Sequence, residues 1–139
     1  MRPLRIQFGI LLALCFSLAT AGDGTSAGEV TSAPRLKVIP LEPGDQAYFL
    51  LLKGPPETRS MRSGLVTLAP GKSIGVHNTK ENEEILVPLA GSGELRIAGE
   101  HPVSLRPGLI TYAPPHTEHD VVNTGSTPLR YIFIVAKAE

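Results

Sequence analysis

Two histidines and one glutamate, His77, Glu84 and His119, are the side chains in this sequence best suited to metal chemistry. Imidazole nitrogens and carboxylate oxygens are common protein ligands of divalent metals. Two imidazoles and one carboxylate can bind one face of an ion and leave its other positions open to water, oxygen or a chelating substrate. Open positions permit Lewis-acid or redox chemistry, which a purely structural site does not. The three residues therefore form a candidate metal site.

The strands expected to position these residues cover 73–77, 84–89 and 119–122. Side chains alternate between the two faces of a strand, so His77 shares a face with the position of Thr79. A short polar loop joins the first two strands, and we expect them to pair antiparallel and place Glu84 near His77. Closure of the sheet would bring His119 to the same point. Spacing alone is weak evidence, because 4 histidines in 139 residues can fall this way by chance.

Other residues near the candidate site leave alternatives open. His116 is an alternative ligand, although its turn after two prolines favours exposure to solvent. Glu83 is an alternative to Glu84, but strand alternation puts it on the opposite face. Asn123, which precedes Thr-Gly, is expected to cap a turn through its side chain. His101 is expected to be exposed beside a hairpin turn.

Four further side chains are candidates for contact with a ligand. Tyr112 and Tyr131 are pocket candidates, although packing between strands explains them equally well. Arg96 and Arg130 would suit a substrate carboxylate, but the sequence does not indicate which face of a strand either one takes.

The first 21 residues are predicted to be a secretory signal peptide. Arg2 and Arg5 precede an apolar run over 6–18, and an A-x-A cleavage pattern follows at 19–21. The run is shorter than the roughly 20 apolar residues that span a bilayer, so we expect no stable membrane insertion after signal removal. Residues 22–34 are predicted to be a flexible leader and 35–139 the single folded domain. The protein is accordingly expected to be secreted or periplasmic.

The composition and the pattern of turns predict an all-β domain. The formal net charge is zero, which gives no reason to expect binding to nucleic acid. The 14 glycines and 13 prolines separate short apolar runs, and no segment has a convincing helical period. Such spacing is typical of a sandwich or small barrel. The expected strands cover 36–41, 46–53, 62–69, 73–77, 84–89, 94–97, 102–105, 109–113, 119–122 and 129–136.

Part of this sequence resembles the first motif of the cupin family, G-x5-H-x-H-x3,4-E-x6-G. Gly71, His77, Glu84 and Gly91 match its positions, and Thr79 stands where the motif has its second histidine.

The family's second motif, G-x5-P-x-G-x2-H-x3-N, is matched by Gly108, Pro114, His119 and Asn123, with His116 in place of the middle glycine. The chain resembles a small single-domain cupin of type 2. That resemblance implies a double-stranded β-helix, or jelly-roll barrel, with a metal inside its open end.

Carried over by position, the resemblance implies His77, Glu84 and His119 as ligands of one divalent ion, with Fe, Mn, Zn, Ni and Co as the candidates. A neutral threonine hydroxyl is a poor ligand, so Thr79 implies an extra water or weaker binding. The implied function is binding of, and action on, a small oxygen-bearing molecule. The alternative is a non-catalytic small-ligand-binding or structural cupin with a degenerate metal site. Cupins often form homodimers through their sheets, and the apolar strands here are consistent with a homodimer or with a covered strand inside a monomer.

Overall fold

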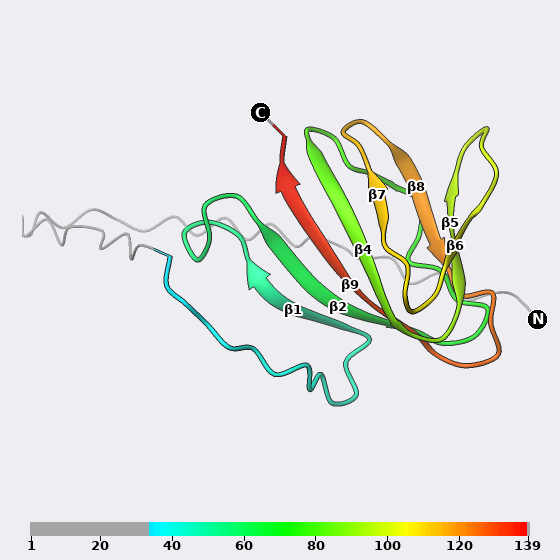
Figure 1. The fold of residues 1–139 in the computed structure, drawn as a ribbon, viewed down its shortest axis with the longest axis horizontal. Helices are drawn as coiled ribbons and strands as arrows, with labels where there is room; N and C mark the ends of the chain where they lie inside the picture. Colours follow the sequence, from blue (N-terminus) through cyan, green and yellow to red (C-terminus); the bar gives the residue numbers. More distant parts are fainter. Residues whose placement is uncertain (1–33, 139) are drawn as a thin grey trace, which may run out of the picture. The chain divides into compact units, whose positions relative to one another are not determined.

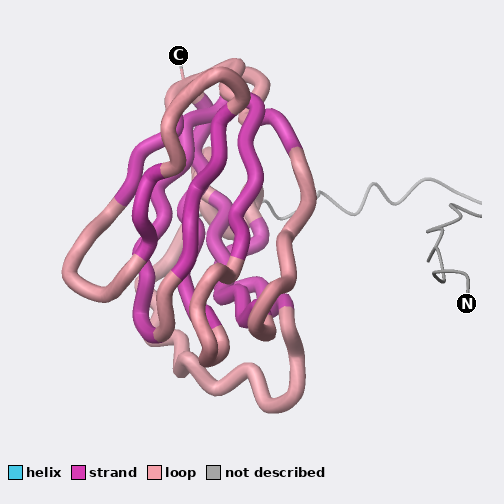
Figure 2. Tube along the Cα trace, turned by 90° about the vertical axis from the view of Figure 1, so that its right-hand side faces the viewer, coloured by secondary structure: helices cyan, strands magenta, loops and turns pink. Residues whose placement is uncertain are grey.

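The computed structural model describes residues 34–138 and contains only strands and loops in that range (Figures 1 and 2). No helix in this range is long and apolar enough to cross a bilayer. The predicted signal peptide, and the predicted leader except for Pro34, lie outside the described residues. The strands are β1 (Tyr48–Lys53), β2 (Arg62–Leu68), β3 (His77–Asn78), β4 (Asn82–Ala90), β5 (Gly93–Ile97), β6 (Val103–Leu105), β7 (Thr111–Ala113), β8 (Glu118–Val122) and β9 (Leu129–Lys137).

The strands form two antiparallel sheets, one of five strands in the order β1-β2-β9-β4-β7 and one of four in the order β3-β8-β5-β6. Figure 1 shows the long strands β2, β9 and β4 side by side, with β8, β5 and β6 beyond β7. Neighbours in the sheets are often distant in sequence, as in β4 beside β9. The prediction of an all-β, double-stranded β-helix fold is confirmed.

Alternating side chains on both sheets form a single apolar core. Apolar side chains that alternate along a strand share one face, and burying that face supplies most of the favourable free energy of folding. The buried cluster contains Val66, Leu68, Leu86, Leu95, Leu105, Val121, Leu129, Tyr131 and Phe133. Its members come from both sheets, so the core lies between them.

β9 is the centre of the larger sheet because it pairs with β2 on one edge and β4 on the other. Leu129, Tyr131 and Phe133 alternate on its inner face and are buried. Ile132 and Ile134 lie on the outer face and are only half-buried. The inner face of this strand is therefore covered from Leu129 to Phe133, and its outer face is covered only in part.

The strand predicted at 36–41 does not form. Leu36 is 97% exposed and Val38 91% exposed, and no strand lies between residue 34 and the start of β1. Pro40 and Pro43 lack the backbone N–H that a sheet ladder needs, which explains why the loose apolar alternation here does not produce pairing.

Asn123 is buried and joins three parts of the backbone, as the expectation of a turn cap requires. Its amide nitrogen donates hydrogen bonds to the carbonyls of Leu68 (2.8 Å) and Thr127 (2.9 Å). Its carboxamide oxygen accepts one from the Gly125 N–H at 2.9 Å. The side chain therefore ties the end of β2 to the turn that follows β8.

Candidate metal centre

His77 and His119 face each other across the pair β3–β8, where they are direct cross-strand partners. Directly opposed residues in an antiparallel pair have closely spaced Cβ atoms. The two imidazole ring centroids are accordingly 4.3 Å apart, with the rings tilted by 58°. A single short ladder thus supplies both imidazoles.

Glu84 reaches the two histidines from the opposite sheet. It lies on β4, which pairs with β7 and β9, whereas β3 pairs with β8. The expected antiparallel pairing of the histidine strand with the glutamate strand is therefore wrong. Residues 79–81 connect one sheet to the other, so His77 and Glu84 meet across the barrel instead of along a hairpin.

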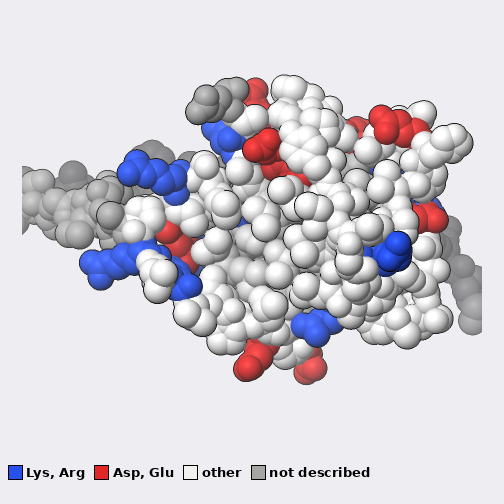
Figure 3. Space-filling view, viewed as in Figure 1, with Lys and Arg blue, Asp and Glu red and all other residues white. Residues whose placement is uncertain are grey.

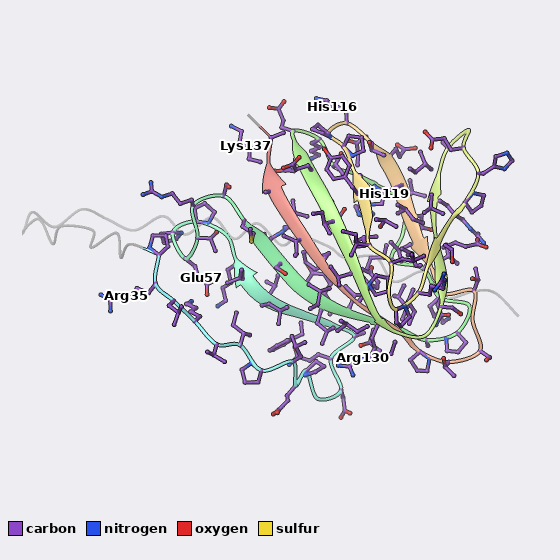
Figure 4. All side chains as sticks on the ribbon, viewed as in Figure 1. Arg35, Glu57, His116, His119, Arg130 and Lys137 are labelled. Carbon is purple, nitrogen blue, oxygen red and sulfur yellow. The ribbon has the colours of Figure 1, made fainter. Side chains whose placement is uncertain are left out.

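The three side chains are close enough to hold one ion. Glu84 Oε2 lies 3.1 Å from His119 Nε2 and 3.9 Å from His77 Nε2, and the ligand atoms all fall within 4.8 Å of one another. The His119 side chain is fully buried, while that of His77 is 44% exposed. The group is thus anchored inside the barrel and open on the His77 side. Figure 4 shows His119 on β8, well below the loop that carries His116.

The hydrogen bonds of both rings direct the Nε2 atoms toward the site. His77 Nδ1 lies 2.9 Å from the Gly75 carbonyl, and His119 Nδ1 lies 3.3 Å from the Thr117 carbonyl. A carbonyl only accepts, so in the neutral rings the proton is on Nδ1 and the Nε2 lone pair is free. Metal-binding histidines use their second nitrogen in this way.

One buried atom supports the fit of a metal directly. His119 Nε2 is buried and makes no hydrogen bond within residues 34–138, although a Glu84 carboxylate oxygen lies 3.1 Å away. Leaving a buried polar atom unpaired is costly. A cation placed between this nitrogen and the Glu84 carboxylate would satisfy both groups, so the residues present suit a divalent ion.

Asp120 stabilises the loop that precedes His77, a role that was not predicted from the sequence. Its carboxylate accepts hydrogen bonds from the Ser73 hydroxyl at 2.6 and 2.8 Å and from the Gly75 N–H at 3.0 Å. Gly75 has a φ of +94°, which breaks a regular ladder. The strand predicted at 73–77 is therefore reduced to an isolated bridge at Ser73 and the short β3.

The carboxylate and the exposed imidazole shift each other's ionisation. Burial alone would raise the pKa of Glu84, but its interactions with His119 and His77 outweigh burial and lower the pKa to about 2. The Glu84 carboxylate, whose Oε2 lies 3.9 Å from His77 Nε2, raises the pKa of His77 above its usual value, against the effect of burial. Without a metal, a proton on His77 therefore stabilises the carboxylate.

In the metal-free protein, the interaction of Glu84 with His77 is expected to make stability depend on pH. The quantity to compare is the difference in unfolding free energy between wild type and Glu84→Gln. Because the folded pKa of Glu84 is lowered, its contribution is present above the unfolded value near 4.5 and is lost as pH falls toward about 2. Because the folded pKa of His77 is raised, its contribution is present below 6.5 and is lost as pH rises through the folded pKa. Urea unfolding of chelator-treated protein should show that wild type exceeds Glu84→Gln in unfolding free energy by the largest amount, on the order of 2 kcal/mol, between these two unfolded pKa values. A difference independent of pH would contradict the pairing.

Thr79 is buried, but its hydroxyl is used by the neighbouring loop. Its Oγ1 donates a hydrogen bond to the Pro114 carbonyl at 2.8 Å and accepts one from the Thr117 N–H at 2.9 Å. Thr117 in turn accepts from His119 Nδ1 through its carbonyl. Thr79 therefore supports the loop that orients His119, at the position where the first cupin motif has a histidine.

Thr79→Val is expected to lower stability by about 2 kcal/mol while leaving metal stoichiometry unchanged. Valine has nearly the same shape but leaves the Thr117 N–H and the Pro114 carbonyl without their partner. Urea unfolding measures the first effect, and metal analysis after dialysis measures the second. Loss of the metal together with unaltered stability would instead make the hydroxyl a ligand.

The alternative ligands are not brought to the site. His116 lies on the loop before β8 with a φ of +59° and is exposed, at a distance from the barrel interior (Figure 4). Glu83 points to the other face of β4, where it accepts a hydrogen bond from the Tyr112 hydroxyl at 3.1 Å. The expectation that Glu83 and Glu84 lie on opposite faces of the strand is confirmed.

The remaining candidates from the sequence lie at different places in the fold. His101 and Arg96 are exposed, and Arg96 is paired with Glu94 at 2.8 Å. Arg130 lies at the opposite end of β9 from Lys137 (Figure 4). Tyr131 is buried, and burial first and the Glu84 charge second raise the pKa of its hydroxyl.

A cleft of about 420 Å³ adjoins His77 and Glu84. Its apolar walls include Val66, Leu86, Val121, Tyr131 and Phe133. Its lining also includes Arg62, which the sequence reasoning missed. Alternation along β2 was the available signal, because Arg62 shares its face with Val66 and Leu68, which are buried in the core.

The described surface has no dominant charge. In Figure 3, Lys, Arg, Asp and Glu are scattered mainly around the rim of the face shown, and much of its centre is uncharged. This distribution agrees with the zero formal net charge.

Comparisons with solved structures find the same fold. A Cupin 2 conserved barrel domain protein from Salinispora arenicola CNS-205 matches with a TM-score of 0.62 and 23% identity, over 75% of this chain and 91% of that one. The Cnp3 cupin domain of Schizosaccharomyces pombe matches with a TM-score of 0.59 and 19% identity, over 66% of this chain and 64%, just under two thirds, of that one. A protein from Thermotoga maritima described as a predicted oxalate decarboxylase matches with a TM-score of 0.56 and 18% identity, over 73% of this chain and 100% of that one.

Sequence comparison gives the family. No match was found among curated proteins. The family model described as "Cupin domain" matches residues 64–135, which include both motifs and all three candidate ligands. That range is more than half of the 139-residue chain. The chain therefore belongs to the cupin family, as a small type-2 cupin domain protein.

Proposed function

We propose that this cupin binds one divalent metal through His77, Glu84 and His119 and takes a small oxygen-bearing molecule in the adjoining cleft. The observation that carries the proposal is the convergence of three ligand atoms from two sheets around the unpaired, buried Nε2 of His119. Two imidazoles and one carboxylate suit Fe, Mn, Zn, Ni or Co. Because the Thr79 hydroxyl is engaged elsewhere, we expect solvent or a ligand at the remaining positions.

A bound ion would supply Lewis-acid or redox chemistry at its open positions. The protein contributes a cleft lined by both apolar and polar side chains, and its volume suits a small molecule. An open site beside a cleft favours ligand binding or catalysis over a structural role. Secretion or a periplasmic location, removal of residues 1–21, and homodimer formation stay predictions.

Metal titration of the purified protein tests this proposal. Chelator-treated protein, loaded in turn with Fe(II), Mn(II), Zn(II), Ni(II) and Co(II) and then dialysed, is expected to retain one ion per chain for at least one metal. A metal content well below one ion per chain that His77→Ala leaves unchanged would contradict metal binding at this site. Oxygen consumption by the Fe(II) form with small diols, keto acids and thiols then tests redox catalysis against binding alone.

A further inference from the structure

Arg62 lies on the same inner row of the larger sheet as Glu84. The register pairs Arg62 with Val135 across β2–β9 and Val135 with Glu84 across β9–β4. Directly opposed residues point to the same face of a sheet, and Glu84 points into the barrel. The backbone positions of Arg62 and Glu84 are two strand spacings, or about 10 Å, apart. A cation and a metal ligand thus border the same cleft at the same end of the sheet.

The aromatic ring of Phe133 supports this arginine. The Arg62 guanidinium carbon lies 6.0 Å from the ring centroid, within the range of a cation–π contact. Phe133 pairs with Gly64 across β2–β9, and a Cβ on Gly64 would lie 2.5 Å from the ring. The absence of a side chain at Gly64 therefore makes room for the ring that flanks Arg62.

The charges around the cleft favour an anion. Within residues 34–138, Arg62 has no carboxylate partner within salt-bridge distance, whereas Arg96 is neutralised by Glu94. Lys80 adds a second positive side chain to the lining, and Glu84 is its one carboxylate. With a divalent ion bound, these groups would leave the cleft strongly positive. A guanidinium binds carboxylates in a planar, two-point geometry, which gives both affinity and orientation.

We propose that Arg62 is a specificity residue that selects small carboxylic acids carrying a second oxygen-bearing group a few carbons away. This inference rests on the proposed metal site. The carboxylate would pair with Arg62, the carbon chain would contact Val135 and Phe133, and the second oxygen group would reach the metal end of the cleft. The strand spacing fits a compound of about four to six carbons.

5-Hydroxypentanoate and 5-hydroxypentanamide are suitable probes, because they have nearly the same size and the same hydroxyl group, and only the first has a carboxylate for Arg62. Their affinities are measured on Co(II)-loaded protein through the visible spectrum of the metal. Wild type is expected to bind 5-hydroxypentanoate at least about tenfold more tightly than the amide. Arg62→Gln should weaken 5-hydroxypentanoate binding by a similar factor and bring the two affinities together, while retaining one ion per chain. Arg62→Lys should keep part of the preference, because it keeps the charge but not the planar fork.

Arg130→Gln is the matched control. Arg130 lies on the outer face of β9, near the end away from Glu84. Its substitution should leave the affinities for both probes and the metal content unchanged. Equal binding of the two probes to wild type, or 5-hydroxypentanoate binding unaffected by Arg62→Gln, would overturn the role of Arg62 while leaving the metal site intact. Failure of wild type to retain Co(II) or any other ion would instead overturn the proposed function. Urea unfolding of Arg62→Gln separates selectivity from packing, because a purely structural role would change stability without changing the ratio of the two affinities.

Discussion

His119→Ala is expected to weaken metal binding by roughly 100-fold or more. Loss of supporting groups around a ligand already costs 10- to 100-fold in metal affinity, and removal of a ligand itself should cost at least as much. His119 is the most constrained of the three candidates, because its side chain is fully buried and Thr117 fixes its ring orientation. Competition against a chromophoric chelator measures the affinity. A second readout is the rise in melting temperature on adding metal, which should largely disappear in the variant.

His116→Ala is the control for this substitution. His116 lies three residues before His119 but is exposed on the loop above the barrel (Figure 4). Its removal should leave both the affinity and the metal-dependent melting shift unchanged. Equal losses in the two variants would mean that the effect is nonspecific, and retention of full affinity by His119→Ala would remove this residue from the site.

Gly91→Ala is expected to destabilise the fold by about 3 kcal/mol. Gly91 has a φ of +74°, and a Cβ there would lie 2.4 Å from the Pro128 carbonyl oxygen and 2.9 Å from the Leu129 Cα. Those are backbone atoms, so relief requires a shift of the chain where β9 begins. The left-handed conformation adds a further strain for any residue with a Cβ. Urea unfolding of metal-free protein measures the loss.

Gly99→Ala separates the two causes. Gly99 also has a positive φ, +80°, but nothing lies within 4 Å of its hypothetical Cβ. It should lose only the conformational part, about 1 kcal/mol. If both substitutions cost the same, close packing against Pro128 does not explain the glycine at position 91.

The strands and the site residues could largely be predicted from local pattern. Alternation along β4 and the spacing to Gly91 selected Glu84 over Glu83, and the structure places only Glu84 beside the histidines. The turn around Asn123 was predictable because an asparagine side chain before Thr-Gly commonly accepts a hydrogen bond from the backbone two residues later. Each of these inferences depends on residues close in sequence.

Which strands become neighbours could not be predicted in the same way. A short loop between two strands usually forms a hairpin. Here Thr79 and the residues after it instead cross between the two sheets. The Thr79 N–H donates a hydrogen bond to the Thr117 carbonyl at 3.1 Å, which holds this crossing in place. Arg62 was missed for the same reason. Its alignment with Glu84 exists only because β9 lies between β2 and β4, and β9 is the last strand of the chain. Long-range pairing is decided by burial of the whole core, which no short window of sequence contains.

The role of Thr79 shows a further limit of motif reading. The first motif marks position 79 as a lost ligand, which suggests a weakened site. The structure gives the same residue two hydrogen bonds to the loop that orients His119. A departure from a family pattern can thus serve the geometry of a neighbouring residue.

A crystal structure of the metal-loaded protein, recorded at the absorption edge of the metal, would show whether the three residues bind one ion. We expect one anomalous peak inside the barrel, about 2.0–2.2 Å from the Nε2 atoms of His77 and His119 and from a carboxylate oxygen of Glu84 if the metal is zinc. A peak at another position, or a well-ordered metal-free site with these three side chains turned apart in protein soaked with excess metal, would contradict it.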